Sequence, residues 1–304
     1  MPTLPKFPEM KPVRLEDRES LEATFRALKP EVSELNFTNL FMFSKVHDYR
    51  LSSLNGNLII RAKSYSGEPY FFPPIGESGV PGAMDALMDY MGERGEKPVI
   101  DLAWKGFIDR YIAPGGPYEF APDRDNSDYL YRTHDLIRLS GRAFHDKKNL
   151  KNRFLRKYGP DSEYRPLTSD LVAQAVELAD RWCHEKCSAD VPSTYGETEA
   201  TITALMNLDA LGTRGGVVLI RGVVQALALG EALNSETAVV HVEKANAEFA
   251  GLYQYTSSEF LAREFPDHAY TNREQDLGEP NLRKSKLSYN PVRMIEKYRV
   301  WPKG

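Results

Sequence analysis

The 304-residue chain lacks several features that would assign it to a specialised class of protein. It has only two cysteines, Cys183 and Cys187, so no disulfide framework is expected. Their C-x3-C spacing offers too few ligands for a metal, and we expect buried or unused thiols. No run of about 18 apolar residues is present, which argues against a membrane span. Since the first residues contain no apolar signal-peptide core, we expect a cytoplasmic protein that could also contact a membrane surface.

The small net charge of -4 conceals two basic segments. Residues 142–157 contain seven Lys and Arg residues and one acid, and residues 281–304 contain the same numbers. Two basic segments on an acidic body favour a local anionic ligand over general binding to nucleic acid. Two solvated helix faces are the alternative.

The same order of secondary-structure elements is predicted in both halves of the chain. Each half is expected to contain a strand, two helices, three strands, a helix, a strand, a helix and a strand. The halves are 1–160, which ends in a basic helix at 142–158, and 161–304. Because residue identities barely match between them, only the topology is repeated.

Three segments carry a resemblance to a known family: "LSGRAFHDKKNLKNRFLRKYG", "VVHVEKAN" and "TNREQDLGEPNLRKSKLSYNPVRMIEKYRV". They resemble the soluble family related to the C-terminal domain of phosphatidylglycerol lysyltransferases, within the Fem-like acyltransferases. The resemblance implies an α+β three-layer fold of two tandem GNAT-like (acyl-CoA N-acyltransferase-like) domains with mixed, mostly antiparallel sheets. It also implies an aminoacyl-tRNA donor and an active site in 161–304.

The basic helix at 142–158 is predicted to contact the donor. Its polar side chains can face outward between the two repeats, where a cleft could form, and Lys and Arg suit a phosphate-rich partner. The residues predicted to bind substrate here are Lys147, Lys148, Lys151, Asn152 and Arg153. A plain amphipathic linker helix is the alternative.

The segment "HVEKAN" is predicted to end a strand beside the reaction site. If Val240 and Val242 face the core, His241, Glu243 and Lys244 face the other side. Glu243 is then a candidate general base or a group that holds a substrate amine, with Lys244 as a substrate contact. An ion pair is the alternative for Glu243, and His241 is expected to be structural.

Charged side chains crowd the turn at Gly278. They would form either an ion-pair network that fixes the turn or a substrate pocket, and we favour the pocket. The catalytic candidates here are Glu274, Asp276 and Lys284, and the substrate-binding candidates are Asn272, Arg273, Lys286 and Tyr289.

Two catalytic signatures are missing. No Q/R-x-x-G-x-G/A loop is present to cradle the pyrophosphate of CoA, and no G-x-S-x-G nucleophile motif occurs. The leading hypothesis is an aminoacyltransferase that uses aminoacyl-tRNA and a small-molecule, peptide or lipid-headgroup acceptor. A CoA-dependent N-acyltransferase using acetyl-CoA and a non-catalytic protein that binds RNA or an anionic headgroup are the alternatives.

Overall fold

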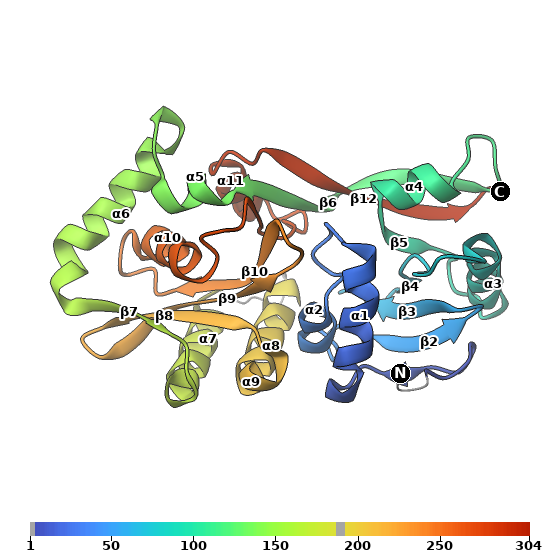
Figure 1. The fold of residues 1–304 in the computed structure, drawn as a ribbon, viewed down its shortest axis with the longest axis horizontal. Coiled ribbons are helices and arrows are strands. Elements are labelled where there is room, and N and C mark those ends of the chain that lie inside the picture. The colour runs from blue at the N-terminus through green and yellow to red at the C-terminus, as the bar shows by residue number, and fades with distance from the viewer. Residues whose placement is uncertain (1–3, 187–191) are drawn as a thin grey trace.

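The computed structural model describes residues 4–186 and 192–304 (Figure 1). The elements of the first half are β1 (Lys11–Pro12), α1 (Arg18–Leu28), α2 (Phe37–Met42), β2 (Arg50–Leu54), β3 (Asn57–Lys63), β4 (Pro69–Phe71), α3 (Val80–Glu93), β5 (Ile100–Trp104), α4 (Lys105–Tyr111) and β6 (Tyr118–Arg132). Two helices follow, α5 (Thr133–Arg138) and α6 (His145–Tyr158).

The elements of the second half are β7 (Ser162–Pro166), α7 (Val172–Lys186), α8 (Pro192–Met206), α9 (Leu208–Leu211), β8 (Arg214–Ile220), β9 (Val223–Ala232), β10 (Thr237–Ala245), α10 (Leu252–Glu264), β11 (Tyr270–Asn272), α11 (Pro280–Leu287) and β12 (Arg293–Pro302). The predicted order occurs in both halves, and α5 and α9 are additional short helices.

The described strands form one twelve-stranded sheet, in the order β1-β2-β3-β4-β5-β12-β6-β11-β10-β9-β8-β7. Neighbouring strands are antiparallel except in the pairs β4–β5 and β10–β11, which are parallel. The expected mixed, mostly antiparallel α+β fold is therefore confirmed. The two halves share a continuous sheet instead of holding one sheet each.

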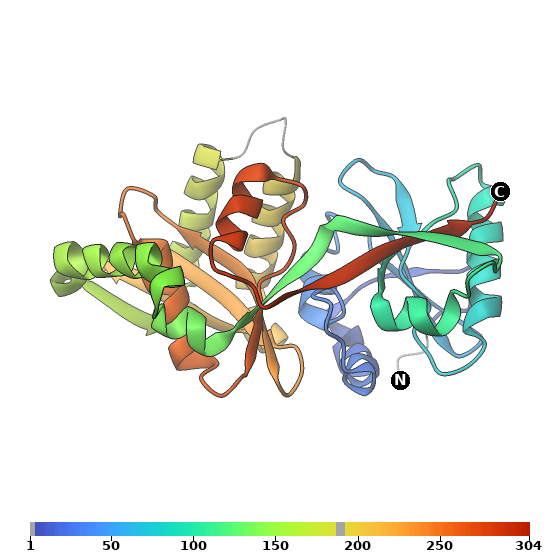
Figure 2. The same ribbon diagram turned by 90° about the horizontal axis from the view of Figure 1, so that it is seen from above.

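β6 and β12 join the halves because both strands cross from one to the other (Figure 2). Near the start of β12, Arg293 is opposite Leu130, and near its end Trp301 is opposite Glu119. The same strand pairs on its other side with β5. The last strand of the chain thus completes the sheet of the first half.

Helices cover both faces of the sheet in the second half, with α6 and α10 on one face and α7 and α8 on the other (Figure 1). The apolar spacing of the sequence explains how α7 packs. Leu171, just before α7, and Ala175, Leu178 and Ala179 within it recur at helical intervals, and all four are buried in the core.

The basic helix α6 lies at the end of the second half that is remote from the first half (Figure 1). The expectation of a cleft around it between the two repeats is wrong, because its apolar side packs on α10. Gly251 at the start of α10 has φ +94° and permits this approach: a Cβ there would be 2.0 Å from the carbonyl oxygen of Leu150.

A buried cluster of charged side chains connects β12 to Glu34 and Asp128 of the first half. Lys297 Nζ on β12 donates to Glu34 Oε1 at 2.6 Å and to Asp128 Oδ1 at 2.7 Å. Asn272 Nδ2 at the end of β11 donates to Asp128 Oδ2 at 3.0 Å. Burial raises the pKa of Glu34 to about 7, although Lys297 opposes that rise.

Of the two cysteines, Cys183 is disulfide-bonded, so the expectation of a buried or unused thiol is wrong there. Cys187 lies outside the described residues. Within residues 4–186 and 192–304, no helix combines the length and the apolarity that a membrane crossing requires.

Candidate active site

The candidate site lies where the parallel strands β10 and β11 separate. Their pairing ends at Val239 and Asn272, and β10 alone continues to Ala245. Beyond Asn272 the backbone turns away, with Glu274 and Leu277 in the left-handed region at φ 55° and 52°. A cavity of about 250 Å³ opens there, and Glu243, Arg273, Glu274 and Lys286 are among its lining residues.

A β-bulge at His241 determines which side chains reach this cavity. The register of β10 against β9 shifts between Val240 and Val242. As a result these two valines lie in different hydrophobic clusters, and the prediction that both face one core is wrong. Glu243 points into the cavity, whereas Lys244 is fully buried on the other side, with its Nζ 2.9 Å from Glu197 Oε1 and 3.5 Å from the centre of the Trp182 ring.

His241 is held between two glutamates. Its Nδ1 is 2.8 Å from Glu274 Oε1, and its Nε2 is 3.0 Å from Glu231 Oε1. Burial opposes the charged ring, but these hydrogen bonds outweigh it and raise the pKa of His241 to about 9. Both nitrogens are satisfied, as expected of a structural histidine. Asn39 on α2 donates to the same Glu274 oxygen at 3.4 Å, so the first half of the chain also contributes to the site.

Lys286 is the cation of α11 that faces the cavity. Its Nζ donates to the carbonyl oxygens of Arg273 at 2.5 Å and Gln275 at 2.6 Å. Burial lowers the pKa of Lys286 to about 8. The ammonium form therefore predominates at neutral pH, with a neutral amine accessible a little above it.

Three buried polar atoms around this cavity lack a hydrogen-bond partner within the described part of the chain. They are Glu243 Oε1, Arg273 Nη1 and Gln275 Oε1. Glu243 and Arg273 form an ion pair through their other atoms. Because buried polar groups are almost always satisfied, these three atoms are available to bind a polar ligand or water in the cavity.

Several of the charged side chains crowded around the turn at Gly278 are hydrogen-bonded to Asp276. Its carboxylate is fully buried and accepts hydrogen bonds from Arg283, Arg124, the Tyr129 hydroxyl and the backbone N–H of Gly278. Burial opposes ionisation, but these donors lower the pKa of Asp276 to about 2. The ion-pair network that was the alternative prediction therefore exists at Asp276, while the pocket lies beside it.

Three other predicted residues, Asn272, Tyr289 and Lys284, do not line the cavity. Asn272 is buried, and its side chain accepts from the backbone N–H of Glu274 at 2.7 Å, which helps to hold that residue in its left-handed conformation. Tyr289 is buried with its ring against the Arg273 guanidinium. Lys284 lies on the other side of α11, beside a separate surface hollow, and is not brought to Glu243 or Glu274.

The predicted residues of α6 divide into two groups. Lys147 lies over the Tyr289 ring at 4.4 Å, and Lys151 Nζ donates to Ser258 Oγ at 2.6 Å, so both side chains have partners within the fold. Lys148 and Arg153 are exposed, and Asn152 is half-buried. None of the five lines the cavity at the end of β10.

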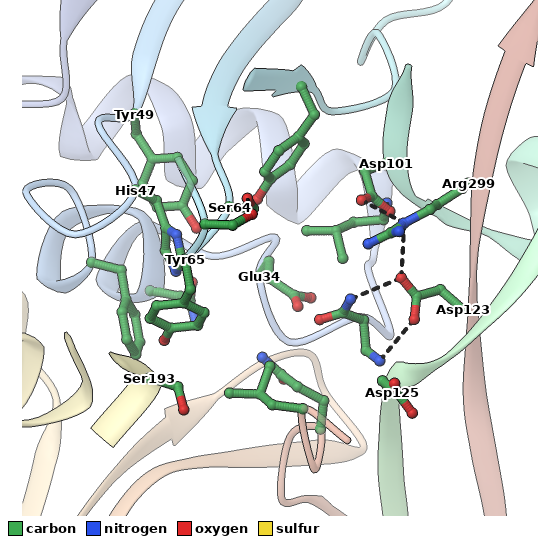
Figure 3. Close-up of a pocket in the computed structure, with 18 of the residues that line it drawn as sticks. Glu34, His47, Tyr49, Ser64, Tyr65, Asp101, Asp123, Asp125, Ser193 and Arg299 are labelled. Carbon is green, nitrogen blue, oxygen red and sulfur yellow. Dashed lines mark hydrogen bonds and ion pairs between the residues drawn. The ribbon is translucent and has the colours of Figure 1, made fainter. Parts of the chain in front are cut away.

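A larger cavity of about 440 Å³ adjoins the first one. It lies beyond the parallel pair β4–β5 of the first half, at the position that corresponds to β10–β11 in the second. Asp101, Asp123 and Arg299 line one side, Tyr49, Tyr65 and His47 line the other, and Glu34 lies between them (Figure 3). The two cavities share walls, which include Phe43, Tyr65 and Gln275.

Sequence reasoning did not identify this second cavity. One signal was present: Asp101 interrupts the otherwise apolar strand "PVIDLA", and a buried acid in such a strand is unusual. The tyrosines carried no comparable signal, because an aromatic residue in a strand is more often part of the core.

The sequence from residue 25 to residue 301 matches the family described as "Phosphatidylglycerol lysyltransferase, C-terminal". The chain belongs to this family. The phosphatidylglycerol lysyltransferase family is one of aminoacyltransferases, and the resemblance stated from the three sequence segments is confirmed. A match to an uncharacterised protein of Mycoplasmoides gallisepticum is 26% identical over 176 residues and spans 58% of this chain and 56% of that protein.

Several solved structures share the fold of this chain. A conserved protein of unknown function from Bacteroides thetaiotaomicron is 31% identical, with 97% of this chain and 99% of that chain covered and a TM-score of 0.87. L-PGS from Bacillus licheniformis is 15% identical over 95% and 92% of the two chains, with a TM-score of 0.64. FemX is 9% identical over 97% of each chain, with a TM-score of 0.55. The last two likenesses show that the fold is shared.

The pKa of His241 leads to a prediction about stability. Because its folded pKa of about 9 exceeds the ordinary value of 6.5, the charged ring stabilises the fold fully below pH 6.5, and this contribution is lost as the pH rises through 9. We expect it to amount to roughly 3 kcal/mol of unfolding free energy. Urea unfolding of the wild type and His241→Gln at pH 6, 7.5 and 9 would measure it.

Subtracting the unfolding free energies of the two proteins isolates the contribution of His241. The lowered pKa of Lys286 makes the fold gain stability as the pH rises above 8, but this gain is present in both proteins and cancels. Equal pH dependence in wild type and variant would contradict a charged His241.

Proposed function

We propose that this protein is an aminoacyltransferase that moves an aminoacyl group from aminoacyl-tRNA to the amine or hydroxyl of an acceptor. One observation carries the proposal beyond family membership. Glu274 and Lys286 meet at one cavity, where β10 and β11 diverge, with three side chains that each have a buried atom without a partner in the described part of the chain, those of Glu243, Arg273 and Gln275. In this proposal 161–304 carries the transfer site, and 1–160 supplies further walls.

The proposed reaction is direct attack without a covalent enzyme intermediate. The acceptor nitrogen or oxygen attacks the ester carbonyl carbon of the donor, the new bond forms, and the ester C–O bond breaks to release the tRNA hydroxyl. Glu274 accepts the proton of the nucleophile and returns it to the departing tRNA oxygen, and the Lys286 ammonium stabilises the oxyanion. Glu243 and Arg273 orient the two substrates.

The exposed basic residues of α6 are proposed to contact the tRNA backbone. Lys148 and Arg153 are exposed, whereas Lys147 and Lys151 are already engaged with Tyr289 and Ser258. Of the five residues of α6 predicted to contact the donor, the proposal keeps phosphate contact for Lys148 and Arg153 and gives Lys147 and Lys151 the role of supporting the helix.

Filter binding of charged and uncharged tRNA at two salt concentrations tests the proposal. We expect tighter binding of the charged form, and a Lys148→Ala/Arg153→Ala variant should lower the slope of log K against log salt by roughly one per lost contact. Arg26→Ala/Lys97→Ala, which removes the same charge from exposed positions of the first half, is the matched control. Absence of tRNA binding by the wild type at low salt would refute the donor assignment.

A further inference from the structure

We propose that the 440 Å³ cavity of the first half binds the acceptor, and that this acceptor is a small molecule anchored by a protonated amine. The inference rests on the proposed function, because it assigns one of the two substrates of that reaction. It excludes an anionic headgroup as the group bound in this cavity.

The charge of the lining is the first argument. Five carboxylates line the cavity, those of Glu34, Asp101, Asp123, Asp125 and Glu279, against one guanidinium, that of Arg299. Burial lowers the pKa of His47, which therefore adds no positive charge at neutral pH.

Asp125 is paired with Arg283, whereas the cations close to Asp101, Asp123 and Glu34 are each shared between two acids. Arg299 Nε is 3.0 Å from Asp101 Oδ2 and 3.1 Å from Asp123 Oδ2. Lys297, behind the wall, is shared in the same way by Glu34 and Asp128. The group of Arg299, Asp101 and Asp123 has two carboxylates for one cation, which favours a bound cation and disfavours an anion, whereas Glu34, with a pKa of about 7, is only partly charged at neutral pH.

The aromatic wall is the second, independent argument. Tyr49 and Tyr70 are only 3% and 8% exposed, and both line the cavity. Neither hydroxyl has a hydrogen-bond partner among the residues that the structure describes. The two hydroxyls are not among the buried polar atoms without a partner in the described residues, so they are open to the cavity and can bond a ligand there, and the faces of tyrosine rings attract ammonium groups.

The position of the cavity is the third argument. It shares Phe43, Tyr65 and Gln275 with the transfer site, and the buried Gln275 Oε1 has no hydrogen-bond partner in residues 4–186 and 192–304. A molecule whose ammonium is held near Asp101 and Glu34 can thus extend its nucleophile along these shared residues towards Glu274. The volume of the cavity, about 440 Å³, suits a compact diamine or amino alcohol better than a lipid.

Calorimetric titration of the full chain without any donor tests this assignment, with cadaverine as the cationic probe and sn-glycerol 3-phosphate as the anionic one. We expect cadaverine to bind with a Kd of about 1 mM and the phosphate not to bind. Asp101→Asn should weaken cadaverine binding roughly tenfold, because the cavity loses one negative charge. Arg299→Met should tighten it, because Asp101 and Asp123 then lose their shared cation.

Opposite effects of these two variants identify an electrostatic cation site, because loss of folding would weaken binding in both. Thermal unfolding of each variant checks that both are folded. No cadaverine binding, tighter binding of the phosphate, or weakening by both folded variants would overturn the inference. Cadaverine binding together with a failed tRNA test would refute the tRNA-dependent function but leave the amine site standing.

Discussion

Lys286→Met is expected to lower the rate of aminoacyl transfer roughly 100- to 1,000-fold, the usual effect of removing one donor to an oxyanion. The side chain lines the transfer cavity, and two backbone carbonyl oxygens fix its ammonium. Methionine keeps the volume of the side chain but cannot stabilise negative charge. Transfer of label from charged tRNA to an amine acceptor would measure the loss.

The same change at Lys284 is the matched comparison. Lys284 is on the same helix but lies beside a separate hollow on its outer side. An equal loss of activity in Lys284→Met would contradict the assignment of the oxyanion role to Lys286.

The pH dependence of the transfer rate of the wild type is an independent test of the role of Lys286. Because burial lowers its pKa to about 8, the ammonium is lost as the pH rises through 8. Transfer that depends on the ammonium should therefore decline above pH 8, whereas a rise there would mean that the neutral amine acts as a base.

Lys297→Met is expected to lower the free energy of unfolding by roughly 3–5 kcal/mol, as when one partner of a buried ion pair is removed. Lys297, Glu34 and Asp128 are all nearly or fully buried, so the change leaves two carboxylates together without a cation. Urea unfolding followed by circular dichroism would measure it, and Lys303→Met at an exposed position just after β12 is the control.

Replacing the two acids as well separates charge from packing. A Lys297→Met/Glu34→Gln/Asp128→Asn variant should recover part of the lost stability, because no buried charge remains unpaired. The single variant should also lose stability as the pH rises above 4.5, the ordinary pKa of Glu34, because burial raises the pKa of Glu34 in the folded state and Lys297, which opposes that rise, is absent. A loss below about 1 kcal/mol in the single variant would contradict a stabilising role for the cluster.

Much of the fold follows from local patterns. The hairpin at Asn55-Gly56 forms because both residues adopt positive φ, at 50° and 79°, and this dipeptide tolerates that conformation well. The helical spacing of buried apolar residues in α7 likewise predicts which face packs on the sheet. Patterns of this kind repeat in the two halves, which is why the order of elements was predictable.

The candidate site was predictable only in part. The sequence placed charged residues at the end of β10 and around Gly278, and Glu243, Arg273, Glu274 and Lys286 do meet at one cavity. It did not separate Lys286 from Lys284, because the direction of each side chain depends on how α11 docks. The bulge at His241 also changes which side chains of β10 face each side of the sheet, and no local sequence pattern predicted this bulge.

The sequence by itself determined the order of helices and strands, the family and the segments that carry charge, because these depend on residues close together along the chain. Only the tertiary structure decided that β12 enters the first half and that Asn39 reaches Glu274. It alone placed an acidic, tyrosine-lined cavity beside the transfer site. These features join residues more than a hundred positions apart, and only the packing of the two halves on one sheet brings such residues together.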